Sequence, residues 1–127
     1  MGRFIANGKT RLAGRVDVSG SKNAALPIIF ATIAMRGVSV IGNLPDITDV
    51  KIALDIVESF GARITRKEQL TYIDTRDLVY TVPCERSVSA LRASTYLLGA
   101  CLARFNIALI QRFGGCNFSQ RPIDMHL

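Results

Sequence analysis

The stretch SGSKNAALPIIFATIAMRG, residues 19–37, decides the fold class of this 127-residue chain. It is apolar on most sides, so it predicts a helix buried in a core rather than one lying on a surface. Ser19 or Ser21 can cap its start, and Gly37 can end it. Pro27 lies in its first turns, where a missing N–H costs least. The apolar part is shorter than the roughly 20 residues that a membrane-spanning helix needs.

Predicted strands and helices alternate along the rest of the chain, and their boundaries follow from hydrophobic period and capping residues. Asp46 or Thr48 can cap the second helix, and Gly61 suits the position just after its end. The predicted elements are, in chain order, strands at residues 12–18 and 38–42, a helix at 44–62, two strands around a turn at 67–69, a helix at 85–105, a strand at 107–113 and a helix start at 121–127. This order is a βαβαββ unit followed by the opening of a second one, which predicts an α/β fold with helices packed on sheets.

The composition fits a folded domain with an anionic partner. Hydrophobic residues make up 49% of the chain, enough for a core, and the net charge is +6. Phosphates, nucleic acid and acidic membranes all suit a basic protein, but the cations are scattered, which weakens a nucleic-acid interpretation. Three cysteines without a C-x-x-C pair and a single histidine argue against a metal site and favour a reducing compartment. The first residues lack the apolar core of a signal peptide.

The start of the predicted helix at residues 19–37 is a candidate anion site. Free backbone N–H groups at a helix N-terminus attract negative charge, and Lys22 adds a full positive charge there, with Asn23 beside it. These two residues would hold a phosphate or a carboxylate. The alternative is an ordinary capped helix with a solvated lysine, because the spacing is not that of a P-loop.

Arg92 lies in the apolar helix predicted at residues 85–105. A guanidinium in such a helix can face a site and pair with a phosphate. It can equally lie at the helix edge with its stem covering apolar surface. The residue pattern leaves both alternatives open.

The segment RFGGCNFSQRPIDMHL, residues 112–127, places Cys116 after two glycines that let the chain bend. A thiol in a cationic loop can act as a nucleophile if its pKa is depressed, or as a proton donor if it stays protonated. It can also be an inert buried cysteine, an interpretation that suits Cys101 in the apolar helix. Asp124 falls in an expected first helical turn, where a carboxylate is stabilising without catalysis, and His126 is most simply a surface residue.

Five stretches together resemble one family. They are SGSKNAALPIIFATIA, NLPDITDV, SALRAS, LGACLARF and GGCNFSQRPIDMH, and they stand in the order and spacing of the UDP-N-acetylglucosamine 1-carboxyvinyltransferases, enolpyruvyl transferases that open bacterial peptidoglycan synthesis. The resemblance runs from about Phe4 to Leu127. The related 5-enolpyruvylshikimate-3-phosphate synthases share the fold and a lysine in the first helix, but they resemble this sequence less.

The resemblance implies an inside-out α/β barrel of two similar domains built from βαβαββ units, with the active site between the domains. Residues 22–127 are expected to form part of the N-terminal domain, with the chain ending inside it. Residues 1–21 are expected to hold first strands that pack with the C-terminal domain. The implied enzyme is cytoplasmic and transfers the enolpyruvyl group of phosphoenolpyruvate to UDP-N-acetylglucosamine. It needs no metal or organic cofactor and binds neither nucleic acid nor membrane, and this fragment alone is expected to be inactive.

Carried over by position, the resemblance implies a role for each candidate residue. Lys22, Asn23 and Arg121 would bind phosphoenolpyruvate. Cys116 would donate a proton from a moving lid and would be the covalent target of fosfomycin. The residues implied in binding UDP-N-acetylglucosamine are Arg92, Arg121, Pro122, Ile123, Asp124 and Met125. Ser119 departs from the pattern, because many members have a glycine there, and the loss of a glycine restricts the lid.

Two other hypotheses remain open. A non-catalytic nucleic-acid-binding module would explain the basic charge, although the sequence shows no aromatic stacking platform. The chain could also be a truncated or degenerate copy that has the fold of the family but no activity.

Overall fold

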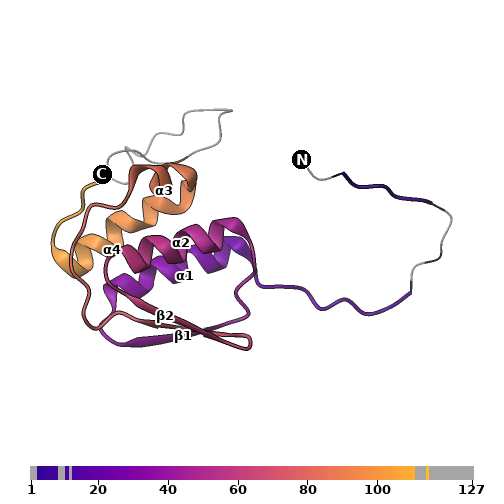
Figure 1. Cartoon of the computed structure of the whole chain (residues 1–127), viewed down its shortest axis with the longest axis horizontal. Coiled ribbons are helices and arrows are strands. Elements are labelled where there is room, and N and C mark those ends of the chain that lie inside the picture. Colours follow the sequence, from indigo (N-terminus) through magenta and orange to yellow (C-terminus); the bar gives the residue numbers. More distant parts are fainter. Residues whose placement is uncertain (1–2, 9–10, 12, 111–113, 115–127) are drawn as a thin grey trace.

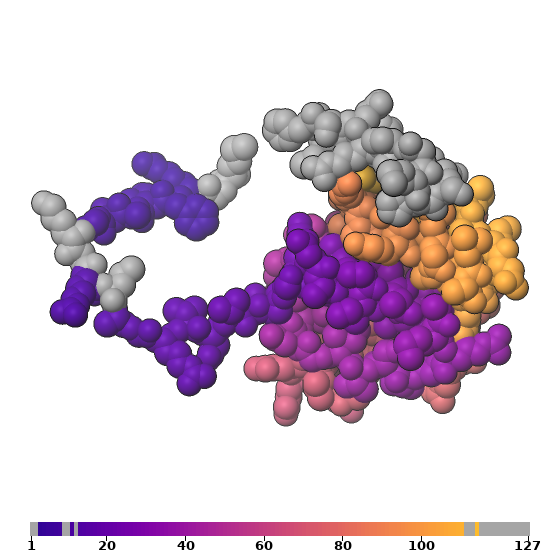
Figure 2. Space-filling model, turned by 180° about the vertical axis from the view of Figure 1, so that it is seen from behind, coloured from indigo at the N-terminus to yellow at the C-terminus, as the bar shows by residue number. Residues whose placement is uncertain are grey.

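The computed structural model describes residues 3–8, 11, 13–110 and 114. The helices cover one face of a small sheet (Figure 1). Figure 2 shows the described residues before α1 leading away from this body. The elements are α1 (Lys22–Ala34), β1 (Val38–Gly42), α2 (Thr48–Ser59), β2 (Arg63–Lys67), β3 (Leu70–Asp74), α3 (Glu85–Ala90), the 3₁₀ helix η1 (Arg92–Thr95) and α4 (Tyr96–Phe105). Within the described residues, no helix combines the length and the apolar character needed to cross a bilayer.

The sheet has the strand order β1-β3-β2, and both strand pairs are antiparallel. The turn predicted near residues 67–69 is confirmed, and Glu68 within it has a positive φ of 54°. Ile64 of β2 pairs with Ile73 of β3, and both pack against the core beneath the helices. Alternate residues point to the opposite face. Exposed apolar residues on that outer face are Val38, Val40 and Leu70.

The helix predicted from the opening stretch is α1, and it lies in the core as its apolar composition requires. It packs against both α2 and α4. The cap residue at its end is Met35 rather than the predicted Gly37. Pro27 lies within the helix, and because a proline has no N–H, the carbonyl group of Asn23 lacks its usual donor four residues on. The buried residues of α1 are Ala25, Leu26, Ile29, Phe30, Thr32 and Ile33.

The boundaries of α2 only partly match the prediction. The helix begins at Thr48, and Ile47 occupies the cap position, so the predicted cap at Asp46 or Thr48 is wrong. The Asp46 side chain makes no capping bond to the helix, and its carboxylate pairs instead with the ammonium of Lys51 at 2.8 Å. The prediction for Gly61 is confirmed, since it follows the cap residue with a φ of 96°, a conformation that favours glycine.

The single long helix predicted at residues 85–105 is wrong. The backbone breaks at Leu91, which is extended (φ −118°, ψ 124°) between α3 and η1. The hydroxyl of Ser94 donates to the carbonyl oxygen of Leu91 at 2.6 Å. The backbone N–H of Ser94 donates to the same oxygen at 3.3 Å, and this i→i+3 bond closes the 3₁₀ turn that follows the break. Arg92 therefore starts a 3₁₀ turn instead of lying in the middle of an apolar helix.

Two predicted strands are also wrong within the described residues. Residues 13–18 and 107–110 form no strand. A strand requires a hydrogen-bonded neighbour, and neither segment pairs with the described sheet. The N–H of Leu109 donates instead to the hydroxyl of Tyr80 at 2.7 Å. Packing of residues 1–21 against another domain stays a prediction.

The C-terminal ends of α1, α2 and α4 are fixed together by aromatic rings and one arginine. Phe60 stacks on Phe105 with ring centroids 5.9 Å apart, and Tyr80 meets Phe105 edge-on at 5.4 Å. Arg104 donates to three backbone carbonyl oxygens, those of Met35 (3.0 Å), Thr75 (2.8 Å) and Arg76 (3.1 Å). The N-terminal ends of the same helices carry the candidate site.

Candidate functional site

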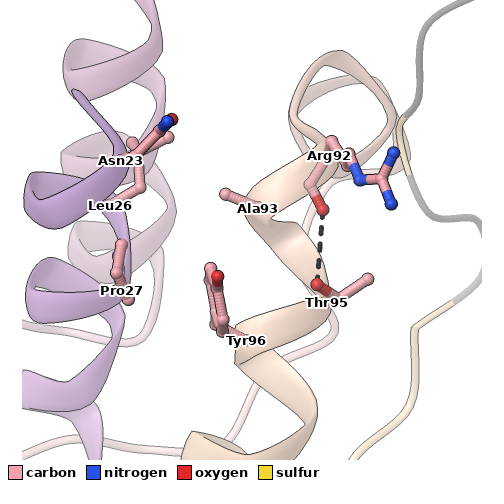
Figure 3. Close-up of a pocket in the computed structure, with 7 residues that line it drawn as sticks. All are labelled: Asn23, Leu26, Pro27, Arg92, Ala93, Thr95 and Tyr96. Carbon is pink, nitrogen blue, oxygen red and sulfur yellow. Dashed lines mark hydrogen bonds between the residues drawn. The ribbon is translucent and has the colours of Figure 1, made fainter. Parts of the chain in front are cut away.

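A pocket opens between α1 and the η1–α4 segment (Figure 3). Its volume is about 340 Å³. It brings Asn23 and Arg92, two predicted ligand-binding residues from distant parts of the sequence, onto facing walls. The lining residues are Asn23, Leu26 and Pro27 on the α1 side, and Arg92, Ala93, Thr95 and Tyr96 on the other.

The first turn of α1 has the properties of an anion site. The carbonyl oxygen of Ser21 accepts hydrogen bonds from the N–H groups of Ala24 (3.2 Å) and Ala25 (2.9 Å). The N–H groups of Lys22 and Asn23 have no such partner among the described residues. The Ser21 side chain makes no capping bond, and the turn contains no acidic residue. The first turn of α1 therefore offers two backbone N–H donors, unpaired in the described part of the chain, and the partial positive charge of a helix N-terminus beside the pocket.

Lys22 lies at this helix end but does not line the pocket. Its Nζ donates to Oδ2 of Asp49, in the first turn of α2, at 2.9 Å. The pair joins the N-terminal ends of α1 and α2, so the two helices start side by side. Nothing in the sequence pointed to Asp49, because an acidic residue in a first helical turn is stabilising by itself.

Arg92 owes its place to the break at Leu91. The hydroxyl of Thr95 donates to the carbonyl oxygen of Arg92 at 3.4 Å and helps to close the 3₁₀ turn (Figure 3). Arg92 is exposed, and its guanidinium points away from α1. The residue thus lines the pocket, while its cation reaches the Asn23 side only through a change of rotamer.

Gly114 lies against the backbone at the same break. A β-carbon added to Gly114 would overlap the backbone carbonyl oxygens of Ser89 and Leu91, so this close approach requires a glycine. Gly114 therefore lies beside the residue that precedes Arg92. The remaining predicted site residues lie outside the described residues: Cys116, Ser119, Arg121, Pro122, Ile123, Asp124, Met125 and His126.

The two described cysteines differ in chemistry. Cys84 is exposed at the cap position of α3, where the backbone N–H groups of Ser87 and Arg86 lower the pKa of its thiol. Cys101 is buried in α4, and burial raises the pKa of its thiol to about 11. The prediction that Cys101 is a core residue is confirmed. The accessibility of Cys84 was missed, because it depends on where α3 begins.

Comparison with known proteins gives a consistent result. The family described as EPSP synthase (3-phosphoshikimate 1-carboxyvinyltransferase) matches residues 6–127. A UDP-N-acetylglucosamine 1-carboxyvinyltransferase of Buchnera aphidicola subsp. Acyrthosiphon pisum is 44% identical over 127 residues, which are 100% of this chain and 30% of that protein. UDP-N-acetylglucosamine 1-carboxyvinyltransferase 2 of Caldanaerobacter subterraneus subsp. tengcongensis is 41% identical with the same coverage, 100% and 30%.

A solved structure shares the fold. The crystal structure of the enolpyruvyl transferase NikO from Streptomyces tendae superposes with a TM-score of 0.68 at 25% identity, over 77% of this chain and 23% of that one. The expected enolpyruvyl-transferase fold is thereby confirmed. The chain spans about 30% of the length of the curated relatives named above. Because the family match extends over nearly the whole sequence, the chain belongs to the EPSP synthase (3-phosphoshikimate 1-carboxyvinyltransferase) family.

Proposed function

We propose that the chain is part of a UDP-N-acetylglucosamine 1-carboxyvinyltransferase. The complete enzyme moves the enolpyruvyl group of phosphoenolpyruvate to the 3′-hydroxyl of UDP-N-acetylglucosamine and releases phosphate. Family membership supports this proposal, as do the relatives of that name at 44% and 41% identity over the whole chain. The observation that carries it is the pocket that brings Asn23 and Arg92 together beside the open first turn of α1.

The first turn of α1 is proposed to hold phosphoenolpyruvate. This substrate carries a phosphate and a carboxylate, so its site needs converging cations and N–H donors. Lys22 and Asn23 offer two open backbone N–H groups, an ammonium and a side-chain amide at one helix end. Arg121 adds a guanidinium, whose planar fork suits two phosphate oxygens.

The opposite wall is proposed to hold the nucleotide sugar. Arg92 has an exposed guanidinium that is available to a diphosphate oxygen. The further contacts assigned to this substrate are those of Arg121, Pro122, Ile123, Asp124 and Met125. On the α1 side of the pocket, Pro27 leaves the backbone carbonyl oxygen of Asn23 without its usual helical donor. A sugar hydroxyl that reaches across the pocket can donate to this oxygen.

Cys116 is proposed as the proton donor of the addition step. The 3′-oxygen forms a bond to the central carbon of the enol ester as its own proton passes to solvent, and the thiol proton goes to the methylene carbon, which leaves a Cys116 thiolate. The tetrahedral adduct then breaks its carbon–oxygen bond to phosphate and loses one methyl proton, which returns to the thiolate, so that the double bond is restored in an enolpyruvyl ether. Gly114, held against the backbone before Arg92, supports this role because Cys116 follows it by two residues in the sequence. A lid that excludes water protects the adduct.

The proposed reaction is the first committed step of peptidoglycan synthesis, and so it belongs to cell-wall growth and division. The proposal includes a cytoplasmic location. The thiols of Cys84 and Cys101, both free in the described part of the chain, suit a reducing compartment.

Phosphate release by a completed protein tests the assignment. Residues 1–127 would replace the matching 30% of the Buchnera relative, and the chimera would receive phosphoenolpyruvate with one acceptor at a time. We expect phosphate release with UDP-N-acetylglucosamine and none with shikimate 3-phosphate. Release with shikimate 3-phosphate alone would overturn the proposed acceptor. A folded chimera that releases no phosphate with either acceptor would overturn the proposed function.

A further inference from the structure

We propose that Asp49 is a positioning residue for Lys22, and that it acts on phosphoenolpyruvate through that lysine alone. This inference rests on the proposed function. Among the described residues, the Lys22 ammonium donates to one acceptor, Oδ2 of Asp49, at 2.9 Å. The two side chains are 51% and 37% exposed, so the pair lies at the surface where a ligand can reach it.

The geometry leaves the ammonium free to bind an anion. A lysine ammonium has three N–H donors, and Asp49 takes one of them, so two remain for phosphate or carboxylate oxygens. Asp49 comes from α2 and Lys22 from α1, so the bond holds the lysine against a second helix. Without it, the long side chain must be ordered when the ligand binds, and such ordering weakens binding by about two- to tenfold.

Within the described residues, Lys22 forms an ion pair with Asp49 and with no other acid. The first turn of α1 contains no acidic residue. Asp46, the nearest acid before Asp49 in the sequence, is paired with Lys51 at 2.8 Å. The Asp46–Lys51 pair is also exposed and of similar length, but it joins no residue of α1 or of the pocket. It therefore serves as a matched control.

Charge and position predict opposite effects of removing Asp49. A carboxylate near an anion site repels the anion, but at about 6 Å in water this repulsion weakens binding by only about threefold, and salt screens it further. Loss of the positioning contact acts in the other direction, and it is the larger effect when the ordering cost lies in the upper part of its range and salt screens the repulsion. Asp49→Asn separates the two, because the amide oxygen can still accept from Lys22 without carrying charge.

Steady-state kinetics of the completed chimera test the proposal. We expect Asp49→Ala to raise the KM for phosphoenolpyruvate about two- to fivefold, which is the upper part of the ordering cost less the screened repulsion, with the KM for UDP-N-acetylglucosamine unchanged. Asp49→Asn should restore the KM for phosphoenolpyruvate, and Asp46→Ala should leave it unchanged. In a Lys22→Ala background, Asp49→Ala should add no further loss, because the two residues act as one unit.

Each contrary result points to a different error. Additive losses in the double variant, or a lower KM in Asp49→Ala, would overturn the positioning role while Lys22 keeps its own effect. An equal rise in both KM values, with a lowered melting temperature, would reassign Asp49 to holding the helices together. If Lys22→Ala itself left the KM for phosphoenolpyruvate unchanged, the proposed phosphoenolpyruvate site would be wrong.

Discussion

Replacing Cys116 with serine in the completed chimera is expected to lower kcat by about 10²- to 10⁴-fold, the range that a positioned general acid contributes. A serine hydroxyl is a far weaker acid than a thiol, so the methylene carbon would lose its proton source. Cys116→Asp is expected to keep turnover, because a carboxylic acid can still donate a proton. The measurement is phosphate release at saturating concentrations of both substrates.

The same two variants test the expected covalent reaction of the protein with fosfomycin. If Cys116 has the proposed role, its thiolate is expected to open the epoxide by forming an S–C bond and breaking a C–O bond, and the freed oxygen then takes a proton. We expect mass spectrometry to find one adduct in the parent protein and none in Cys116→Ser or Cys116→Asp. The background should carry Cys84→Ser, because Cys84 is exposed with a lowered pKa, whereas Cys101 is buried with a pKa of about 11. An adduct that survives in Cys116→Ser would remove Cys116 from the proposed role.

Replacing Phe60 with alanine is expected to cost about 3–5 kcal/mol of the free energy of unfolding. Phe60 is 1% exposed and follows the last helical residue of α2, where its ring faces both Phe105 and Tyr80. The truncation leaves a cavity and removes two aromatic contacts, each worth about 0.5–1.5 kcal/mol beyond burial. Urea unfolding of the chain, followed by circular dichroism, gives the change.

Phe4 provides the matched control for that prediction. Its side chain is 100% exposed in the segment before α1, so Phe4→Ala deletes the same atoms without opening a cavity. We expect the two unfolding curves to differ by the full cost of the Phe60 cavity. Equal midpoints for Phe60→Ala and Phe4→Ala would show that the aromatic cluster does not hold the helix ends together.

Local sequence signals predicted the elements that are stabilised locally. The apolar stretch that forms α1 and the turn around Glu68 both carry their own signals, and both are confirmed. Strands that need a partner were less predictable, because hydrogen bonding depends on what lies alongside. Residues 13–18 have a strand-like pattern, but the described sheet ends at β1 and β2 and does not pair with them.

The site was predictable in its residue types but not in its geometry. Lys22, Asn23 and Arg92 were all named from the sequence, and the pocket brings two of them together. At the break, the carbonyl oxygen of Leu91 accepts from Ser94 and lies close to Gly114. The helical periodicity of the sequence does not predict either contact. Asp49 escaped notice for a similar reason, because its pairing with Lys22 arises only when α1 and α2 lie side by side.

Binding of phosphoenolpyruvate measured by calorimetry tests most directly the claim that the start of α1 forms the phosphoenolpyruvate site. The measurement uses the completed chimera with the Cys116→Ser substitution and with UDP-N-acetylglucosamine added, so that the ligands bind without turnover. Lys22→Met removes one cation from the site, and Arg36→Met removes an exposed cation outside the pocket lining. The account predicts that Lys22→Met weakens phosphoenolpyruvate binding about 10- to 100-fold, as expected for a hydrogen bond to a charged group, and that Arg36→Met leaves it unchanged. Equal dissociation constants for phosphoenolpyruvate in the Lys22→Met and Arg36→Met proteins would contradict it.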